Sequence, residues 1–340
     1  MNSIKSIIEA CQRTNDLTAL RSQCVNGYGA NSERRAAYRL LLDIPKAYSP
    51  TISPKYDYSG IEQIRKDVNR SYSYIKLQDF KEKKKTQLLR VLACLFEKNP
   101  NLIYYQGFHD IAIMVLSFSR ESLALLILEK LGNGLLKMFM GKDLDGMESL
   151  LLFCESLLKI VNKDIFQYFE RYDIQITLFT SYIMTLFANN VSTFEYGLRF
   201  LDFFIASHPL MPIYTIISLI DLEKIKMTQK NLDPSIVQNV LQETNISVDR
   251  IIQNAVAIYQ KYPPNVVLDM DKTLEISEKC DYLSPSITFP YSFPSFPFYN
   301  PISLNQYTNH LEQYKGKSLT TRILKELALA ASIGMKILIE

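Results

Sequence analysis

The chain has 340 residues, of which 47% are hydrophobic and 21% charged, and its formal net charge is +3. This length suffices for one large domain or two ordinary domains with a full apolar core. The small net charge excludes an electrostatic argument for nucleic acid as a partner. Five cysteines and three histidines without ligand spacing predict reduced thiols and no metal site.

No segment has the pattern of a signal peptide or a membrane-spanning helix. Residues 1–10 carry Lys5 and Glu9 and lack a long apolar core. A spanning helix needs roughly 18 to 20 apolar residues, and the nearest candidate, residues 327–339, is interrupted by Lys336. We therefore expect a soluble, cytoplasmic protein.

Helical periodicity dominates the chain, with little strand-like alternation, so the fold class is predicted to be all-α. Apolar residues three and four positions apart predict helices over residues 4–11, 17–24, 33–42, 81–97, 111–118, 123–131, 135–140, 150–161, 165–172, 176–187, 194–206 and 247–262. Asn31 or Ser32 is the expected cap of the third helix, and residues 71–80 are expected to be irregular. Asp233-Pro234 predicts a further helix start, and Pro263-Pro264 predicts a stop.

A helix after the proline- and serine-containing loop of residues 48–60 carries the first motif, Ile64-x-x-Asp67-x-x-Arg70. Asp67 and Arg70 are three residues apart and therefore share a helix face, so the carboxylate could hold the guanidinium in a fixed pose. An ordinary surface ion pair, worth a few tenths of a kcal/mol, would have the same spacing.

Residues 102–110 form the second motif, Leu-Ile-Tyr-Tyr-Gln-Gly-Phe-His-Asp, between an Asn-Pro-Asn turn signal and an apolar helix. Gln106 offers a donor and acceptors on one short arm, and Gly107 lets another backbone or a ligand approach closely. Tyr104, Tyr105 and Asp110 flank this pair. A helix N-terminus capped by polar residues is the structural alternative.

A third polar pair, Arg199 and Asp202, lies in the apolar helix predicted over residues 194–206. An unpaired buried charge is costly, so we expect these two residues to pair with each other. Their role is expected to be structural.

Together the first two motifs resemble the signature motifs of TBC domains, the GTPase-activating domains for Rab GTPases. Ile64, Asp67 and Arg70 match the first family motif, and the second, Tyr-x-Gln-Gly-x-x-Asp in the family, is matched from Tyr104 to Asp110. The motifs occur in the family order about 35 residues apart. The resemblance covers roughly residues 17–267 and includes the opening family helix, with Tyr38 where the family usually has tryptophan.

The resemblance implies a multi-helix fold of two helical subdomains and an activity exerted on a Rab GTPase in its GTP form. Arg70 would be an arginine finger and Gln106 a glutamine finger, both supplied in trans. Asp67 would fix Arg70, while Tyr104, Gly107 and Asp110 would shape the glutamine loop. No cofactor of its own is implied, because Mg²⁺ and GTP belong to the partner, and no independent active site is expected.

We predict a TBC domain over residues 1–275 and a tail over residues 276–340. Residues 284–304 are rich in Pro, Ser, Phe and Tyr and are expected to form a linker, a strap or a groove-binding segment. Residues 319–339 predict a final helix, amphipathic and then apolar, for which peripheral contact with a membrane is an open alternative. Several phrases, among them Tyr262-Pro263-Pro264, resemble a family branch that acts between endoplasmic reticulum and Golgi and typically ends in a membrane anchor.

Two other classes of function compete with the activator. A Rab effector or scaffold would bind the GTPase without catalysis, although the presence of both finger residues favours catalysis. A helical-repeat scaffold would show self-similarity at a fixed period, which the sequence lacks.

Overall fold

The computed structural model describes residues 3–141, 145–191, 193–228, 237, 242–271, 274 and 280–283. All regular structure in these residues is helical. The α-helices are α1 (Ile4–Thr14), α2 (Thr18–Ser22), α3 (Asn31–Leu41), α4 (Ile61–Arg70), α5 (Gln78–Lys98), α6 (Phe108–Phe118), α7 (Glu121–Asn133), α8 (Asp145–Val161), α9 (Lys163–Arg171), α10 (Thr180–Met184), α11 (Phe194–Ala206), α12 (Met211–Thr228), α14 (Val248–Lys261) and α15 (Pro264–Met270). Short 3₁₀ helices are η1 (Gln23–Val25), η2 (Lys137–Met140), η3 (Ile176–Phe179) and η4 (Asp281–Leu283).

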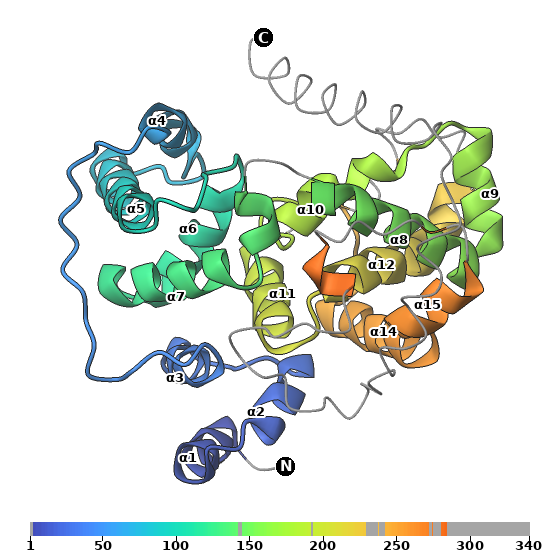
Figure 1. Cartoon of the computed structure of the whole chain (residues 1–340), viewed down its shortest axis with the longest axis horizontal. Coiled ribbons are helices and arrows are strands. Elements are labelled where there is room, and N and C mark those ends of the chain that lie inside the picture. The colour runs from blue at the N-terminus through green and yellow to red at the C-terminus, as the bar shows by residue number, and fades with distance from the viewer. Residues whose placement is uncertain are drawn as a thin grey trace.

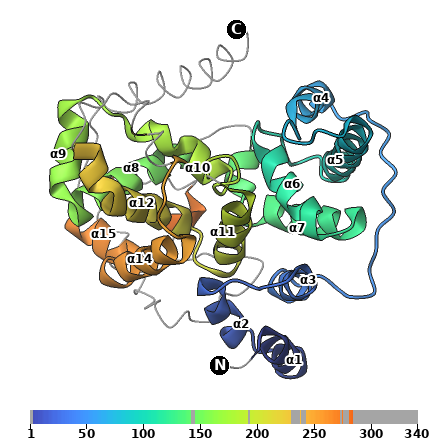
Figure 2. The same ribbon diagram turned by 180° about the vertical axis from the view of Figure 1, so that it is seen from behind.

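The helices form two groups that lie side by side (Figures 1 and 2). Helices α4 to α7 pack on one another in the first group, and α8, α9, α10, α12, α14 and α15 pack together in the second. Helix α11 lies between the groups, since it contacts α3 and α6 as well as α14. The expected all-α fold with two helical subdomains is confirmed.

The pattern of apolar residues explains how α5 and α6 pack. The first half of α5 is basic and largely exposed, whereas Leu88, Val91, Leu92 and Leu95 in its second half are buried. Helix α6 is buried on nearly every face, which fits its almost continuous apolar sequence. This burial places the loop before α6, which carries the second motif, against the core.

Some predicted boundaries were wrong. Helix α5 begins at Gln78 rather than at residue 81, and α3 begins at Asn31 with Ala30 at the N-cap position. The helix predicted over residues 176–187 is split into η3, α10 and a turn. The predicted stop at Pro263-Pro264 is confirmed, since α14 ends at Lys261. Pro264 also opens α15, because a residue in the first turn of a helix has no intrahelical use for its N–H.

Several expectations concern residues that the structure does not describe. The Asp233-Pro234 helix start, the proline-rich segment 284–304 and the helix of residues 319–339 lie outside the described residues, and the division at residue 275 stays a prediction. Within the described ranges, no helix is long and apolar enough to cross a bilayer. The same ranges contain no cluster of His, Cys, Asp and Glu suited to a metal ion.

Candidate functional site

Arg70 is the last residue of α4, and Asp67 lies one turn before it on the same face. Arg70 Nη2 lies 2.8 Å from Asp67 Oδ1; the arginine side chain is 34% exposed, whereas the Asp67 side chain is fully buried. The guanidinium is therefore held by a buried carboxylate, while about a third of the arginine side chain is exposed to solvent. Ile64, one turn before Asp67, is also fully buried and fixes this end of α4 in the core.

The buried carboxylate of Asp67 joins the two sequence motifs. Its Oδ2 accepts a hydrogen bond of 2.5 Å from the Tyr104 hydroxyl, and its Oδ1 accepts one of 3.1 Å from Gln63 Nε2. Burial and the charge of Asp67 raise the pKa of Tyr104. The phenol therefore stays protonated and donates a hydrogen bond to the carboxylate. Tyr104 is thus tied to the residue that holds Arg70.

His109 extends this network and was not singled out from the sequence. Its Nδ1 lies 3.2 Å from the Tyr104 hydroxyl, and its Nε2 lies 3.3 Å from Asp110 Oδ1. Because the Tyr104 hydroxyl donates its hydrogen to Asp67, its oxygen can only accept a hydrogen bond from His109 Nδ1–H. A proton on either His109 Nε2 or the Asp110 carboxyl group then makes the hydrogen bond between those two side chains. Burial lowers the pKa of His109 and raises the pKa of Asp110. The only sequence signal for His109 was its place inside the second motif.

Gln106 lies in the loop between α5 and α6, and its side chain is exposed. The residues on either side are held. The Tyr105 hydroxyl donates to the Met184 carbonyl at 2.7 Å. Gly107 has φ of +101°, and a Cβ at this position would lie 2.8 Å from Thr185 Cγ2. A residue with a side chain would be strained here both by its backbone and by Thr185, so the position requires glycine.

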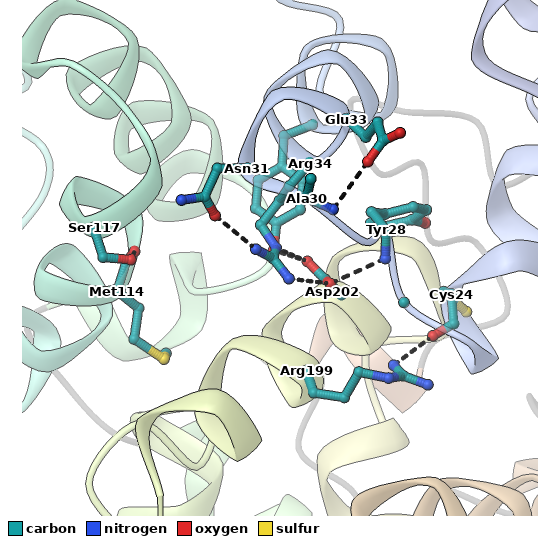
Figure 3. Close-up of polar contacts among 12 residues, drawn as sticks. Cys24, Tyr28, Ala30, Asn31, Glu33, Arg34, Met114, Ser117, Arg199 and Asp202 are labelled. Atoms are coloured by element: carbon teal, nitrogen blue, oxygen red, sulfur yellow. Dashed lines mark hydrogen bonds and ion pairs between the residues drawn. The ribbon is translucent and has the colours of Figure 1, made fainter. Parts of the chain in front are cut away.

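The expected pairing of Arg199 with Asp202 was wrong. Asp202 is fully buried and accepts instead from Arg34, with Nε at 2.8 Å and Nη2 at 3.0 Å. It also accepts from the Tyr38 hydroxyl at 2.9 Å and from the Tyr28 N–H at 3.2 Å. All four donors come from residues 28–38, so Asp202 ties this N-terminal segment to α11. Figure 3 shows Arg34 and Tyr28 beside Asp202.

Arg199 points to different partners. It donates to the carbonyl oxygens of Cys24, at 2.8 Å, and of Val25, and it pairs with Asp249 at 3.1 Å. Although the two residues share a helix face, Arg199 donates to carbonyl oxygens of η1 and Asp202 accepts from side chains of α3. Both contacts join the N-terminal helices to α11, so the expected structural role fits the geometry.

Comparisons with known proteins agree with this architecture. The sequence profile of the Rab-GTPase-TBC domain family matches residues 32–228, more than half of the chain. The crystal structure of the Ypt/Rab-GAP domain of Gyp1p is similar with a TM-score of 0.54 at 14% identity, covering 77% of this chain and 100% of that one. At this identity the likeness shows the fold alone.

Relatives that share more of the sequence are named for a TBC domain or as a GTPase-activating protein. TBC1 domain family member 20 of Bos taurus is 27% identical over 278 residues, which cover 77% of this chain and 68% of that protein. The human protein of the same name has the same identity and coverage. The GTPase-activating protein gyp10 of Schizosaccharomyces pombe is 32% identical over 212 residues, covering 61% of this chain and 57% of that protein. The chain belongs to the Rab-GTPase-TBC domain family.

Proposed function

We propose that this protein is a GTPase-activating protein that stimulates GTP hydrolysis by a Rab-family GTPase. The observation that carries the proposal is the arrangement of the two motifs around one buried carboxylate. Asp67 holds the solvent-facing guanidinium of Arg70 and also bonds Tyr104, two residues before the exposed Gln106. Membership of the TBC family supports this assignment.

In the proposed mechanism Arg70 enters the active site of the GTPase as an arginine finger. Charge develops on the phosphoryl oxygens during transfer, and a guanidinium can bridge two of them while staying ionised. Such a finger supplied in trans accelerates hydrolysis by about 10³ to 10⁵, which corresponds to roughly 4 to 7 kcal/mol of barrier. The ion pair with Asp67 restricts the rotamers of Arg70 before the partner binds, so less ordering remains to be done in the complex.

Gln106 would orient the attacking water. In this role its side chain would lie beside the γ-phosphate of the bound GTP. The exposed side chain and the fixed backbone on both sides suit a group that must reach into another protein. Mg²⁺ and GTP would be carried by the partner, so this chain needs no cofactor of its own. Asp67, Tyr104, Tyr105, Gly107 and Asp110 would act as supports for the two fingers.

The cellular setting is part of the proposal. From the resemblance of the sequence to a branch of the TBC family, the partner would be a Rab in its GTP form acting in vesicle traffic between endoplasmic reticulum and Golgi. The protein would work in the cytoplasm, with peripheral membrane contact through residues 319–339. A TBC domain over residues 1–275 would carry the activity.

The test is single-turnover GTP hydrolysis by a panel of purified Rabs with wild type, Arg70→Ala and Gln106→Ala. One or a few Rabs should be accelerated at least about a hundredfold, and either substitution should remove most of the gain. Arg65→Ala is the matched control, since Arg65 lies on the same helix, is 43% exposed and pairs with an exposed Glu62 at 3.3 Å. Binding of a GTP-loaded Rab without acceleration would instead identify an effector, and no binding at all would refute the proposal.

A further inference from the structure

The residues on either side of Gln106 contact two consecutive residues of the other half of the domain. The Tyr105 hydroxyl donates to the carbonyl of Met184, and the backbone of Gly107 lies against the methyl group of Thr185. Met184 ends α10, and Thr185 follows it. The loop that presents Gln106 is therefore held from outside its own helical group.

The segment that makes these contacts is itself tightly fixed. The Thr185 hydroxyl donates to the Ser181 carbonyl at 2.7 Å, and Asn190 Nδ2 donates to Ser181 Oγ at 3.0 Å. Thr185 and Asn190 are only 3% and 5% exposed. Side-chain hydrogen bonds thus close residues 181–190 into a compact unit, which we name the 181–190 turn.

The backbone of this turn is strained where it leaves α10. Leu186 and Phe187 have φ of +49° and +65°, in the left-handed region that residues with a side chain seldom adopt. Both side chains are buried, and the Phe187 ring packs on those of Phe200 and Phe204 of α11 at centroid distances of 5.0 and 5.5 Å. Such strain persists only where the surroundings over-determine the conformation, and it clusters at functional sites.

Side chains of the second motif divide between two directions. Tyr104 and His109 contact each other, and Tyr104 bonds Asp67, which holds Arg70. Tyr105 and Gly107 instead contact the 181–190 turn, and Gln106 between them is exposed. The two fingers therefore have separate supports, although the residues of those supports are neighbours in sequence.

We propose that Tyr105 and the 181–190 turn are positioning elements for Gln106 alone, and that they do not act on Arg70. This inference rests on the proposed function, and it adds a support from the second helical group that the motifs do not contain. Removing the Tyr105 hydroxyl leaves the ring packed against Phe108 and Phe139 but frees the loop from Met184. Gln106 should then sample more orientations, and a small misplacement of a reacting group is costly in rate.

The decisive experiment is a pair of double-mutant cycles in Rab-stimulated single-turnover hydrolysis. Tyr105→Phe should lower the maximal rate about tenfold with little change in the Rab concentration that gives half of it. The same tenfold loss should appear in an Arg70→Lys background, which keeps the charge. In a Gln106→Ala background the further loss should be below about twofold, because the group being positioned is gone.

Tyr214→Phe is the matched control. Its hydroxyl also donates to a backbone carbonyl, that of Tyr262, at the same 2.7 Å, and it lies on α12. It should leave the maximal rate unchanged at a similar cost in thermal stability. A Tyr105→Phe rate equal to wild type, or a tenfold loss that persists without Gln106, would overturn the proposal.

Amide hydrogen exchange on the isolated protein separates this inference from the proposed function. Peptides covering residues 104–108 should exchange at least about fivefold faster in Tyr105→Phe than in wild type, while peptides covering residues 64–70 stay unchanged. Unchanged exchange at residues 104–108 would refute the positioning role whether or not any Rab is activated. Failure of the wild type to accelerate any Rab would refute the proposed function. The exchange measurement would then still test whether Tyr105 holds the Gln106 loop.

Discussion

Asp202 offers the sharpest test of what joins the N-terminal helices to the rest of the domain. It is fully buried on α11 and accepts four hydrogen bonds, two of them from the guanidinium of Arg34. The Arg34 side chain is only 10% exposed, so Asp202→Ala would leave a nearly buried cation without its partner. Breaking a buried pair in this way costs about 3 to 5 kcal/mol, a large fraction of the roughly 5 to 15 kcal/mol that stabilises a domain.

The free energy of unfolding would be measured by urea titration followed by far-ultraviolet circular dichroism. Asp249→Ala is the control, because Asp249 also pairs with an arginine but is 61% exposed, and exposed pairs contribute about 0 to 1 kcal/mol. Replacing both partners, as Arg34→Met with Asp202→Leu, should cost less than Asp202→Ala alone, since no unpaired charge remains. An Asp202→Ala loss no larger than that of Asp249→Ala would refute the reasoning.

Three further predictions concern titration, backbone strain and thiol reactivity. Burial lowers the pKa of His208 to about 4 from 6.5, so the unfolded chain binds the proton first as pH falls. The stability of the neutral form is present above pH 6.5 and is lost between pH 6.5 and 4. The lowered pKa can remove at most about 3 kcal/mol from the free energy of unfolding. We expect a loss of roughly half that amount, because the His208 side chain is partly exposed. His208→Asn should reduce the difference between urea midpoints at pH 7 and pH 5, and an unchanged difference would contradict this assignment. Gly107→Ala should lower the stimulated rate at least about tenfold with Rab binding retained. Adding Thr185→Ser, which removes the crowding methyl group, should recover part of it, whereas no recovery would exclude the contact as a cause. Burial raises the pKa of the Cys24 thiol to about 12, so alkylation at pH 8 should be slow in the folded protein and fast in urea; rapid labelling without urea would show that this thiol is accessible.

Two pairs with the same spacing show where sequence reasoning succeeds and where it fails. Asp67 and Arg70 are three residues apart on α4 and do form an ion pair, at 2.8 Å. Arg199 and Asp202 are also three apart on a helix, yet Asp202 pairs with Arg34, 168 positions earlier in the chain. Helical spacing fixes which side chains share a face, but the partner of a buried charge depends on every donor that the fold brings near it.

The prediction of a single helix over residues 176–187 was wrong for a related reason. Its apolar residues have helical spacing, and no glycine or proline marks a break. Leu186 and Phe187 adopt positive φ because burial of both side chains, the packing of Phe187 on α11 and the hydrogen bonds around Thr185 outweigh the local cost. Tertiary packing overrode local propensity there, and the resulting turn is what contacts the Gln106 loop.

The sequence by itself determined the all-helical class, most helix positions and the two motifs, because apolar periodicity, caps and short-range pairs are local properties of the chain. Only the tertiary structure decided that Tyr104 bonds Asp67 and contacts His109, and that Tyr105 and Gly107 contact the 181–190 turn. The same is true of the pairing of Asp202 with Arg34. These contacts join residues up to 168 positions apart. They depend on which helices pack together, and no local pattern encodes that.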